Sequence, residues 1–135
     1  REQLVIEHPD TPDLGFLYGC LLTDGQAPSA NGETRNLCVF GGGQVDRSAT
    51  GSGIAARLAL AYKDNGIAAG EICAVSGLSG IAFDGAIREV RDDGRLIVTV
   101  TGTGHRSGAG EFEVEGDDPL QDGFELPARL ADQAG

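Results

Sequence analysis

Basic residues are scarce in this sequence of 135 residues, which holds 10 Lys and Arg against 21 Asp and Glu. The formal net charge is therefore −11. A surface this acidic repels phosphate backbones and anionic lipid headgroups, so we expect neither a nucleic-acid partner nor a membrane partner. A small solute is the more natural ligand for such a chain.

Long apolar runs are also missing. No run approaches the roughly 20 residues of a membrane-spanning helix, and the N-terminus lacks a charged segment followed by an apolar one. Methionine is absent, and the first residue is Arg1. We therefore interpret the chain as a piece of a longer protein, and we expect a soluble protein in the cytoplasm.

The three cysteines, Cys20, Cys38 and Cys73, do not form a recognisable motif. None lies in a CxxC pair or in a Cys/His cluster with metal-ligand spacing, so we predict reduced thiols and no metal site. Cys38 is expected to be a small buried residue. His8 and His105 lie far apart in the sequence, and we expect both in turns or on the surface.

Glycine is abundant, with 22 residues in the chain, whereas average usage is about 7%. Most glycines stand singly among short apolar runs, which indicates turns and close backbone approaches rather than disorder. A polar segment, residues 26–36, predicts an exposed loop. Asp93-Gly94 predicts a hairpin with a type I′ turn. The apolar runs predict strands at residues 4–6, 14–23, 37–40, 71–75, 81–90, 95–101 and 111–114.

One helix is predicted, from Ile54 to Asn65, because this segment is rich in Ala and Leu and contains no Pro or Gly. Gly66 suits the left-handed position that follows a helix. The helix has few polar positions, so we expect the sheet to enclose most of it. We find no linker that divides the chain, and we expect a single α+β lobe over residues 1–135.

The segment just before this helix, residues 46–53, has the properties of an anion site. The N–H groups of a first helical turn lack intrahelical partners, and the helix dipole favours negative charge there. Gly51 and Gly53 would let a carboxylate or phosphate approach the backbone. The alternative, which the residues leave open, is that the polar side chains of this segment only cap the helix.

A second pattern in the same place, Gly51-x-Gly53-x-x-Ala56, has the shape of a dinucleotide-binding fingerprint. Its context does not fit, because the residues before Gly51 are polar rather than a buried strand, and Glu71 opens a strand instead of closing one. The sequence also lacks the GxxxxGK[ST] pattern of a P-loop. A nucleotide-binding module is therefore the least favoured interpretation.

From Phe40 to Gly53 the chain reads FGGGQVDRSATGSG. This segment resembles the proline racemase family, whose second signature is Asp-Arg-Ser-Pro-Cys-Gly-Thr-Gly. The resemblance continues through IAARLA, SGIAFDGAI and GEFEVEGDDPLQDGF, and so covers most of the chain. It implies the C-terminal half of a two-lobed, cofactor-independent enzyme that forms a homodimer. The implied fold is similar to that of diaminopimelate epimerase, a curved, mostly antiparallel sheet wrapped around one central helix.

Thr50 departs from this signature, because the racemases and epimerases have their second catalytic cysteine at that place. Racemisation needs an acid or base on each face of the α-carbon, and a threonine hydroxyl is too weak an acid for this role. Thr followed by Gly-Ser-Gly is similar to the trans-3-hydroxy-L-proline dehydratase subgroup. Those enzymes use one cysteine, on the other lobe, to remove the α-proton while the 3-hydroxyl leaves, which gives pyrroline-2-carboxylate. Ala49 replaces the usual proline, and we have no physical account of this change.

The family's first cysteine motif, of the Met-Cys-Gly-His type, is absent. The resemblance therefore implies half an active site, completed by an N-terminal lobe of the same protein, and we expect the chain to be inactive alone. Two alternatives stay open. One is a proline racemase or 4-hydroxyproline epimerase of the same fold, and the other is a non-catalytic lobe that binds an amino acid.

The resemblance also implies roles for matching residues toward a small imino acid. Asp46 would pair with the ring ammonium, and Gly51 and Ser52 would donate backbone N–H groups to the carboxylate. Thr50 would face the α-carbon or the departing hydroxyl, directly or through a water molecule. Phe40 would form a wall of the pocket against the pyrrolidine ring.

Overall fold

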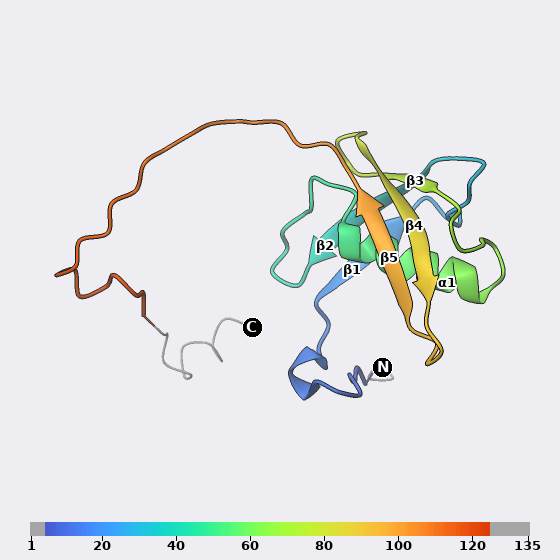
Figure 1. Cartoon of the computed structure of the whole chain (residues 1–135), viewed down its shortest axis with the longest axis horizontal. Coiled ribbons are helices and arrows are strands. Elements are labelled where there is room, and N and C mark those ends of the chain that lie inside the picture. Colours follow the sequence, from blue (N-terminus) through green and yellow to red (C-terminus); the bar gives the residue numbers. More distant parts are fainter. Residues whose placement is uncertain (1–4, 125–135) are drawn as a thin grey trace. The chain divides into compact units, whose positions relative to one another are not determined.

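The computed structural model describes residues 5–124 and groups the chain into two compact units, residues 1–104 and 105–135. Every helix and strand of the described part belongs to the first unit (Figure 1). Within the described part, no helix has the length and apolar character needed to cross a membrane. The elements, in chain order, are the 3₁₀ turn η1 (Pro12–Leu14), β1 (Gly19–Thr23), β2 (Thr34–Phe40), α1 (Gly51–Lys63), β3 (Cys73–Ser76), β4 (Ala82–Val90) and β5 (Leu96–Thr101).

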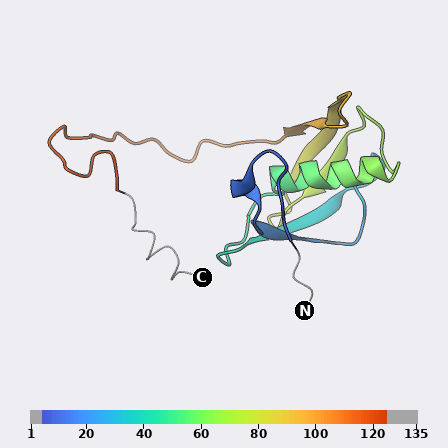
Figure 2. The same cartoon turned by 90° about the horizontal axis from the view of Figure 1, so that it is seen from below.

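The five strands form one sheet in the order β1-β2-β3-β4-β5. Only β2 and β3 pair in parallel, and the other neighbours are antiparallel. A parallel pair needs a crossover connection, and α1 lies in that connection. Figure 2 shows the sheet curling so that α1 runs between its β1–β2 end and its β4–β5 end. The predicted α+β architecture, a curved and mostly antiparallel sheet with one helix, is confirmed.

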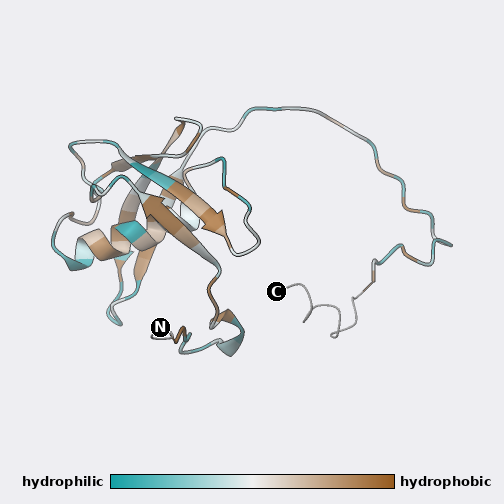
Figure 3. Ribbon diagram, turned by 180° about the vertical axis from the view of Figure 1, so that it is seen from behind, coloured by the Kyte–Doolittle hydropathy of each residue, from teal (hydrophilic) through white to brown (hydrophobic). Residues whose placement is uncertain are grey.

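The core lies between α1 and the concave side of the sheet. Ile54, Leu58 and Ala61 form one buried stripe along the helix, as their spacing predicts. Figure 3 shows hydrophobic residues gathered on the strands and on α1. The helix lies directly on β4, since a Cβ atom at Gly85 would be 2.6 Å from Cγ2 of Ile54. The remaining fully or nearly buried apolar residues of this core are Ala49, Ile67, Cys73, Val75 and Ile87.

The helix differs from its prediction in three ways. It runs from Gly51 to Lys63 rather than over residues 54–65, because the glycine-rich segment already adopts the helical conformation. The left-handed residue after it is Asn65, with φ +56°, and not Gly66; asparagine tolerates this region better than most residues. Leu60 is 62% exposed. The expectation of a largely enclosed helix therefore holds only in part, because the curled sheet leaves the side of the helix that carries Leu60 open.

The first two strands also have different bounds from those predicted. The strand expected at residues 14–23 begins only at Gly19, because Pro12 starts a 3₁₀ turn that ends at Leu14. The strand expected at residues 37–40 begins earlier, at Thr34, inside the predicted exposed loop. Thr34 and Asn36 are buried there, and their side chains form hydrogen bonds within the protein. The first part of this strand was predicted as a loop because its side chains are polar, although they are buried and hydrogen-bonded inside the protein.

The hairpin at Asp93-Gly94 is confirmed, but its turn is not of type I′. That type needs a positive φ at both central residues, and only Gly94 has one, at +81°. The Gly94 N–H donates to the carbonyl of Arg91, and the Arg91 N–H donates to the carbonyl of Arg95. This pattern fits a turn that ends in one left-handed glycine, which is a common hairpin form.

Two further predicted strands do not form. Residues 111–114 alternate in polarity, but they pair with no strand in the described structure, and Phe112 is 93% exposed. Alternation alone cannot make a strand, because a strand needs a hydrogen-bonded neighbour. Residues 5 and 6 of the expected strand 4–6 are not extended in a sheet, and residue 4 lies outside the described residues. The assignment of residues 1–135 to a single lobe stays a prediction.

Gly85→Ala is expected to destabilise the protein by about 1–3 kcal/mol, because the new methyl group overlaps Ile54 and Leu58 in a filled core. Urea unfolding measures this change. Gly32→Ala is the matched control, since a Cβ atom there meets nothing within 4 Å, and its effect should stay within about 0.5 kcal/mol. Equal losses in the two variants would contradict the close contact between β4 and α1.

Candidate functional site

Asp46 lies in the connection between β2 and α1, where its N–H and both carboxylate oxygens form hydrogen bonds. Its N–H donates to the carbonyl of Cys38 over 3.0 Å, which ties the residue to β2. Its Oδ1 accepts the N–H of Ser48 at 2.8 Å, and its Oδ2 accepts the hydroxyl of Thr50 at 2.9 Å. The carboxylate is therefore held in one orientation by the loop that follows it.

The same hydrogen bonds lower the pKa of Asp46 below its ordinary value of 3.8. The Ser48 N–H contributes most and the Thr50 hydroxyl next, while partial burial acts in the opposite direction. Donors that point at a carboxylate stabilise its charged form. Asp46 is consequently an anion at neutral pH, suited to bind a cation and unsuited to donate a proton.

Thr50 has an unusual backbone conformation, with φ +58° and ψ 95°. This left-handed region is disfavoured for a β-branched residue and has to be imposed by the surroundings. Thr50 is buried, its N–H donates to Oγ of Ser48 at 3.0 Å, and its carbonyl accepts the N–H of Ile54 at 2.9 Å. Its hydroxyl is thus aimed at Asp46 by the backbone.

The alternative in which these polar side chains only cap the helix is not supported. Thr50 occupies the N-cap position, yet its side chain makes no capping hydrogen bond. Asp46 and Ser48 accept N–H groups of the loop itself. The first hydrogen bond of α1 is the one donated by Ile54, so the preceding N–H groups, those of Gly51 and Ser52 among them, have no acceptor within the helix.

Three residues that the sequence did not single out support this loop. Nδ2 of Asn36 donates to the buried carbonyl of Ala49 over 3.1 Å. Gly77 lies against the loop so closely that a Cβ atom there would be 2.5 Å from the carbonyl of Ser48. Arg57 in turn contacts Asn36. No local pattern marks such residues, because their partners are distant in sequence. The only available signal was the family resemblance of the loop, which indicates that residues packed against it matter.

An open hollow of about 390 Å³ lies beside the loop. Its polar side includes Asp46 and its apolar side includes Phe83, so it can accept a small solute with both characters. Phe40 does not line it; its ring lies edge-on against Tyr18, with 5.3 Å between the ring centres. The lining residues are Asp46, Arg47, Ser48, Ser79, Ile81, Phe83 and Thr103.

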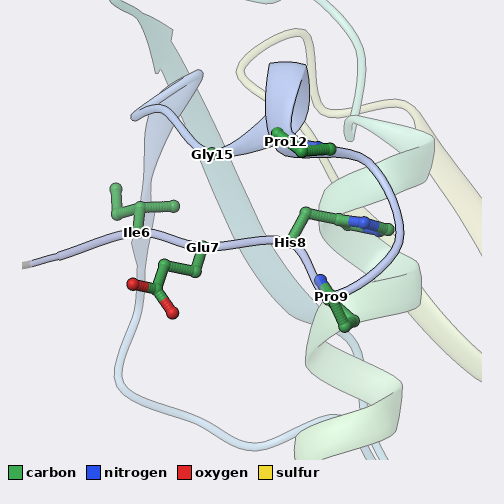
Figure 4. A pocket seen from close by; sticks show the side chains of 6 residues that line it. All are labelled: Ile6, Glu7, His8, Pro9, Pro12 and Gly15. Atoms are coloured by element: carbon green, nitrogen blue, oxygen red, sulfur yellow. The ribbon is translucent and has the colours of Figure 1, made fainter.

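A larger hollow of about 530 Å³ lies at the bend of residues 6–15 (Figure 4). His8 lines it, and its Nδ1 accepts the N–H groups of Asp10 and Thr11 at 3.3 and 3.0 Å, so this histidine has the turn role that was predicted. None of the predicted site residues lines this hollow. It is formed by one bent segment, and we do not assign a reaction to it.

The thiols agree with the sequence analysis as far as the structure describes them. All three cysteines are free; Cys38 is buried as predicted, Cys73 is also buried, and Cys20 is exposed. Burial raises the pKa of the Cys73 thiol. Among residues 5–124, His, Cys, Asp and Glu form no group of three or more that could hold a metal ion.

A family model described as proline racemase matches residues 1–125, which include the whole Asp46–Thr50 loop. The chain belongs to the proline racemase family. It is 45% identical over 130 residues to the trans-3-hydroxy-L-proline dehydratase of Homo sapiens, covering 93% of this chain and 37% of that protein. It is 36% identical over 127 residues to the enzyme of the same name from Colwellia psychrerythraea, covering 92% of this chain and 36% of the relative.

Two solved structures share the fold of this family member. One is a probable proline racemase from Agrobacterium radiobacter K84 with bound carbonate, with a TM-score of 0.67 at 26% identity over 90% of this chain and 36% of that one. The other is a hydroxyproline epimerase from Agrobacterium vitis with bound trans-4-OH-L-proline, with a TM-score of 0.66 at 26% identity over 91% and 35%. The chain thus spans little more than a third of the length of its relatives.

Thr50→Val should raise the pKa of Asp46 toward 3.8, because it removes the hydroxyl while keeping a β-branched side chain. Thr50→Ser keeps the donor and should leave this pKa low. Nuclear magnetic resonance of the Asp46 carboxyl carbon during an acid titration measures both. Identical titrations in the parent and the valine variant would contradict the role of this hydrogen bond.

The same two variants should also differ in the pH at which acid unfolds them. A carboxyl whose pKa is lower in the folded state stabilises the protein above its unfolded pKa, and this contribution is lost as the pH falls through the folded pKa. Thr50→Val loses part of that contribution. We expect its acid unfolding to begin at a higher pH than that of Thr50→Ser, as followed by circular dichroism.

Proposed function

We propose that this chain is the C-terminal lobe of a cofactor-independent trans-3-hydroxy-L-proline dehydratase. The observation that carries the proposal is Thr50, which stands at the place of the family's second catalytic cysteine and donates its hydroxyl to the Asp46 carboxylate. A hydroxyl in this position cannot supply the second acid or base that racemisation needs. The identities to proteins named as trans-3-hydroxy-L-proline dehydratases support the same reaction.

Substrate binding in this proposal uses opposite charges at two ends of the loop. The Asp46 anion pairs with the ring ammonium of the imino acid, a charge-assisted contact that fixes the direction of the α-hydrogen. The N–H groups of Gly51 and Ser52, at the start of α1, hold the substrate carboxylate. They also stabilise the negative charge that spreads into the carboxylate in the transition state.

The reaction is an elimination of water. A cysteine on an N-terminal lobe, which this chain does not contain, removes the α-proton, and the electrons of the broken C–H bond form a double bond to the 3-carbon. The C–O bond at the 3-carbon breaks with its electron pair, the hydroxide takes up a proton from solvent and leaves as water, and the cysteine later returns the α-proton to solvent. Thr50 faces the departing hydroxyl, directly or through a water molecule. The product is pyrroline-2-carboxylate, and both lobes are needed for turnover.

A second candidate is an epimerase that acts on 4-hydroxyproline. The structural likeness to the hydroxyproline epimerase from Agrobacterium vitis favours it. It requires a group other than Thr50 to reprotonate the α-carbon on the opposite face. A lobe that binds an amino acid without chemistry would show neither reaction.

The full-length protein should convert trans-3-hydroxy-L-proline to pyrroline-2-carboxylate in deuterated buffer, as followed by nuclear magnetic resonance. Asp46→Asn should lower kcat/KM about 10- to 100-fold, because a hydrogen bond to a charged group is worth about 1.5–3 kcal/mol. Asp93→Asn is the matched control. Asp93 also has a lowered pKa, caused by Arg95, but it lies in the β4–β5 turn.

Three outcomes separate the candidates. Product formation that Asp46→Asn weakens and Asp93→Asn does not is the expected result. Deuterium entry into 4-hydroxyproline with inversion, and no elimination, would replace the dehydratase with the epimerase. Calorimetric binding of an imino acid without product or exchange would replace both with the binding lobe.

A further inference from the structure

Arg57 on α1 is a buried cation surrounded by neutral acceptors. It is 8% exposed. Its Nη1 donates to Oδ1 of Asn36 at 2.5 Å and to the carbonyl of Arg35 at 3.3 Å. Its Nη2 donates to Oγ1 of Thr34 at 2.9 Å and to the carbonyl of Gln26. The guanidinium therefore joins the helix to β2 and to the segment before it.

A carboxylate reaches this cluster only from its edge. Asp24 accepts the Thr34 hydroxyl at 2.7 Å and the N–H of Arg35 at 2.9 Å. Because the Thr34 hydroxyl donates to Asp24, its lone pairs are free to accept from Arg57. The polar groups of this cluster therefore all have hydrogen-bond partners, and the direction of each hydrogen bond, from donor to acceptor, is fixed.

Asn36 is the member that links this cluster to the site. It is 3% exposed and bonds on both sides of its amide. Arg57 can only donate, so it requires the amide oxygen to face it, and Nδ2 must then face the opposite way. There Nδ2 donates to the carbonyl of Ala49 over 3.1 Å. The arginine, which can only donate, and the loop carbonyl, which can only accept, therefore require the same orientation of this amide.

The carbonyl of Ala49 belongs to the peptide group that precedes Thr50. Holding this carbonyl fixes the plane of that peptide, and so restricts the φ of Thr50, which is +58°. From this backbone position the Thr50 hydroxyl reaches Asp46. The path from Arg57 to the candidate site is therefore a continuous series of four groups, each held by the one before it.

We propose that Asn36, oriented by Arg57, is a positioning residue that keeps Thr50 in its left-handed conformation and its hydroxyl on Asp46. The effect on turnover rests on the proposed function, but the effect on the loop does not. If Asn36 had a purely structural role, its substitution would lower the stability of the whole sheet and would not loosen the loop more than the rest of the fold.

The test is Asn36→Asp in the full-length protein. Aspartate keeps an oxygen for Arg57 at nearly the same size, but it replaces the Nδ2 donor with an oxygen that repels the Ala49 carbonyl. We expect amide hydrogen exchange of residues 47–54, measured by mass spectrometry, to become at least about tenfold faster. Exchange of residues 82–101, in β4 and β5, should not change. Turnover of trans-3-hydroxy-L-proline should fall about 10- to 100-fold, mainly in kcat.

Thr34→Val is the matched control, because it removes another buried contact of Arg57 and leaves both bonds of Asn36 intact. Its exchange over residues 47–54 should equal that of the parent. If Asn36→Asp does not fold, Arg57→Lys replaces it, since a single ammonium group cannot hold all four acceptors. This variant should also speed exchange over residues 47–54.

Unchanged exchange over residues 47–54 in the folded variant would overturn the proposal. An equal rise in Thr34→Val would also overturn it, because any loss in the cluster would then loosen the loop. If the parent protein does not dehydrate the substrate, the proposed function fails, while the exchange measurements still decide the role of Asn36.

Discussion

The hydrogen bond from Thr50 to Asp46 is the interaction on which the candidate site depends. It is made by a β-branched residue in the left-handed region, which a free chain would avoid. It also contributes, after the Ser48 N–H, to the lowered pKa of Asp46, and it directs the carboxylate. Without this bond, the carboxylate of Asp46 would be held by the Ser48 N–H alone.

The rest of the fold supports this one loop from several directions. β2 holds the backbone of Asp46 through Cys38, and the turn after β3 approaches the loop at Gly77, where no side chain fits. Asn36 holds the Ala49 carbonyl from beneath. These supports come from segments as distant in sequence as Asn36 and Gly77, and the curled sheet with its crossover helix brings them together. The sheet is therefore a frame that imposes strain on a short loop.

Much of the architecture could be predicted from the sequence, since apolar runs mark all five strands of the sheet, with some errors in their bounds, and the Ala-rich segment marks the helix. The errors have common physical causes. β2 was predicted too short because Thr34 and Asn36 are polar yet buried, and their partners are distant. Residues 111–114 were predicted as a strand from alternation alone, but a strand also needs a neighbour, and the described residues provide none.

The sequence by itself determined the family and the place of the candidate site: the Asp46–Gly53 segment and its resemblance to the family signature follow from local order along the chain. Only the tertiary structure decided that the Thr50 hydroxyl points at Asp46 instead of capping α1. It also decided that Arg57 and Asn36 support this loop through a series of hydrogen bonds. A motif records which residues are neighbours in the chain. Backbone strain and the direction of a buried amide depend on contacts across the fold, and no short pattern encodes them.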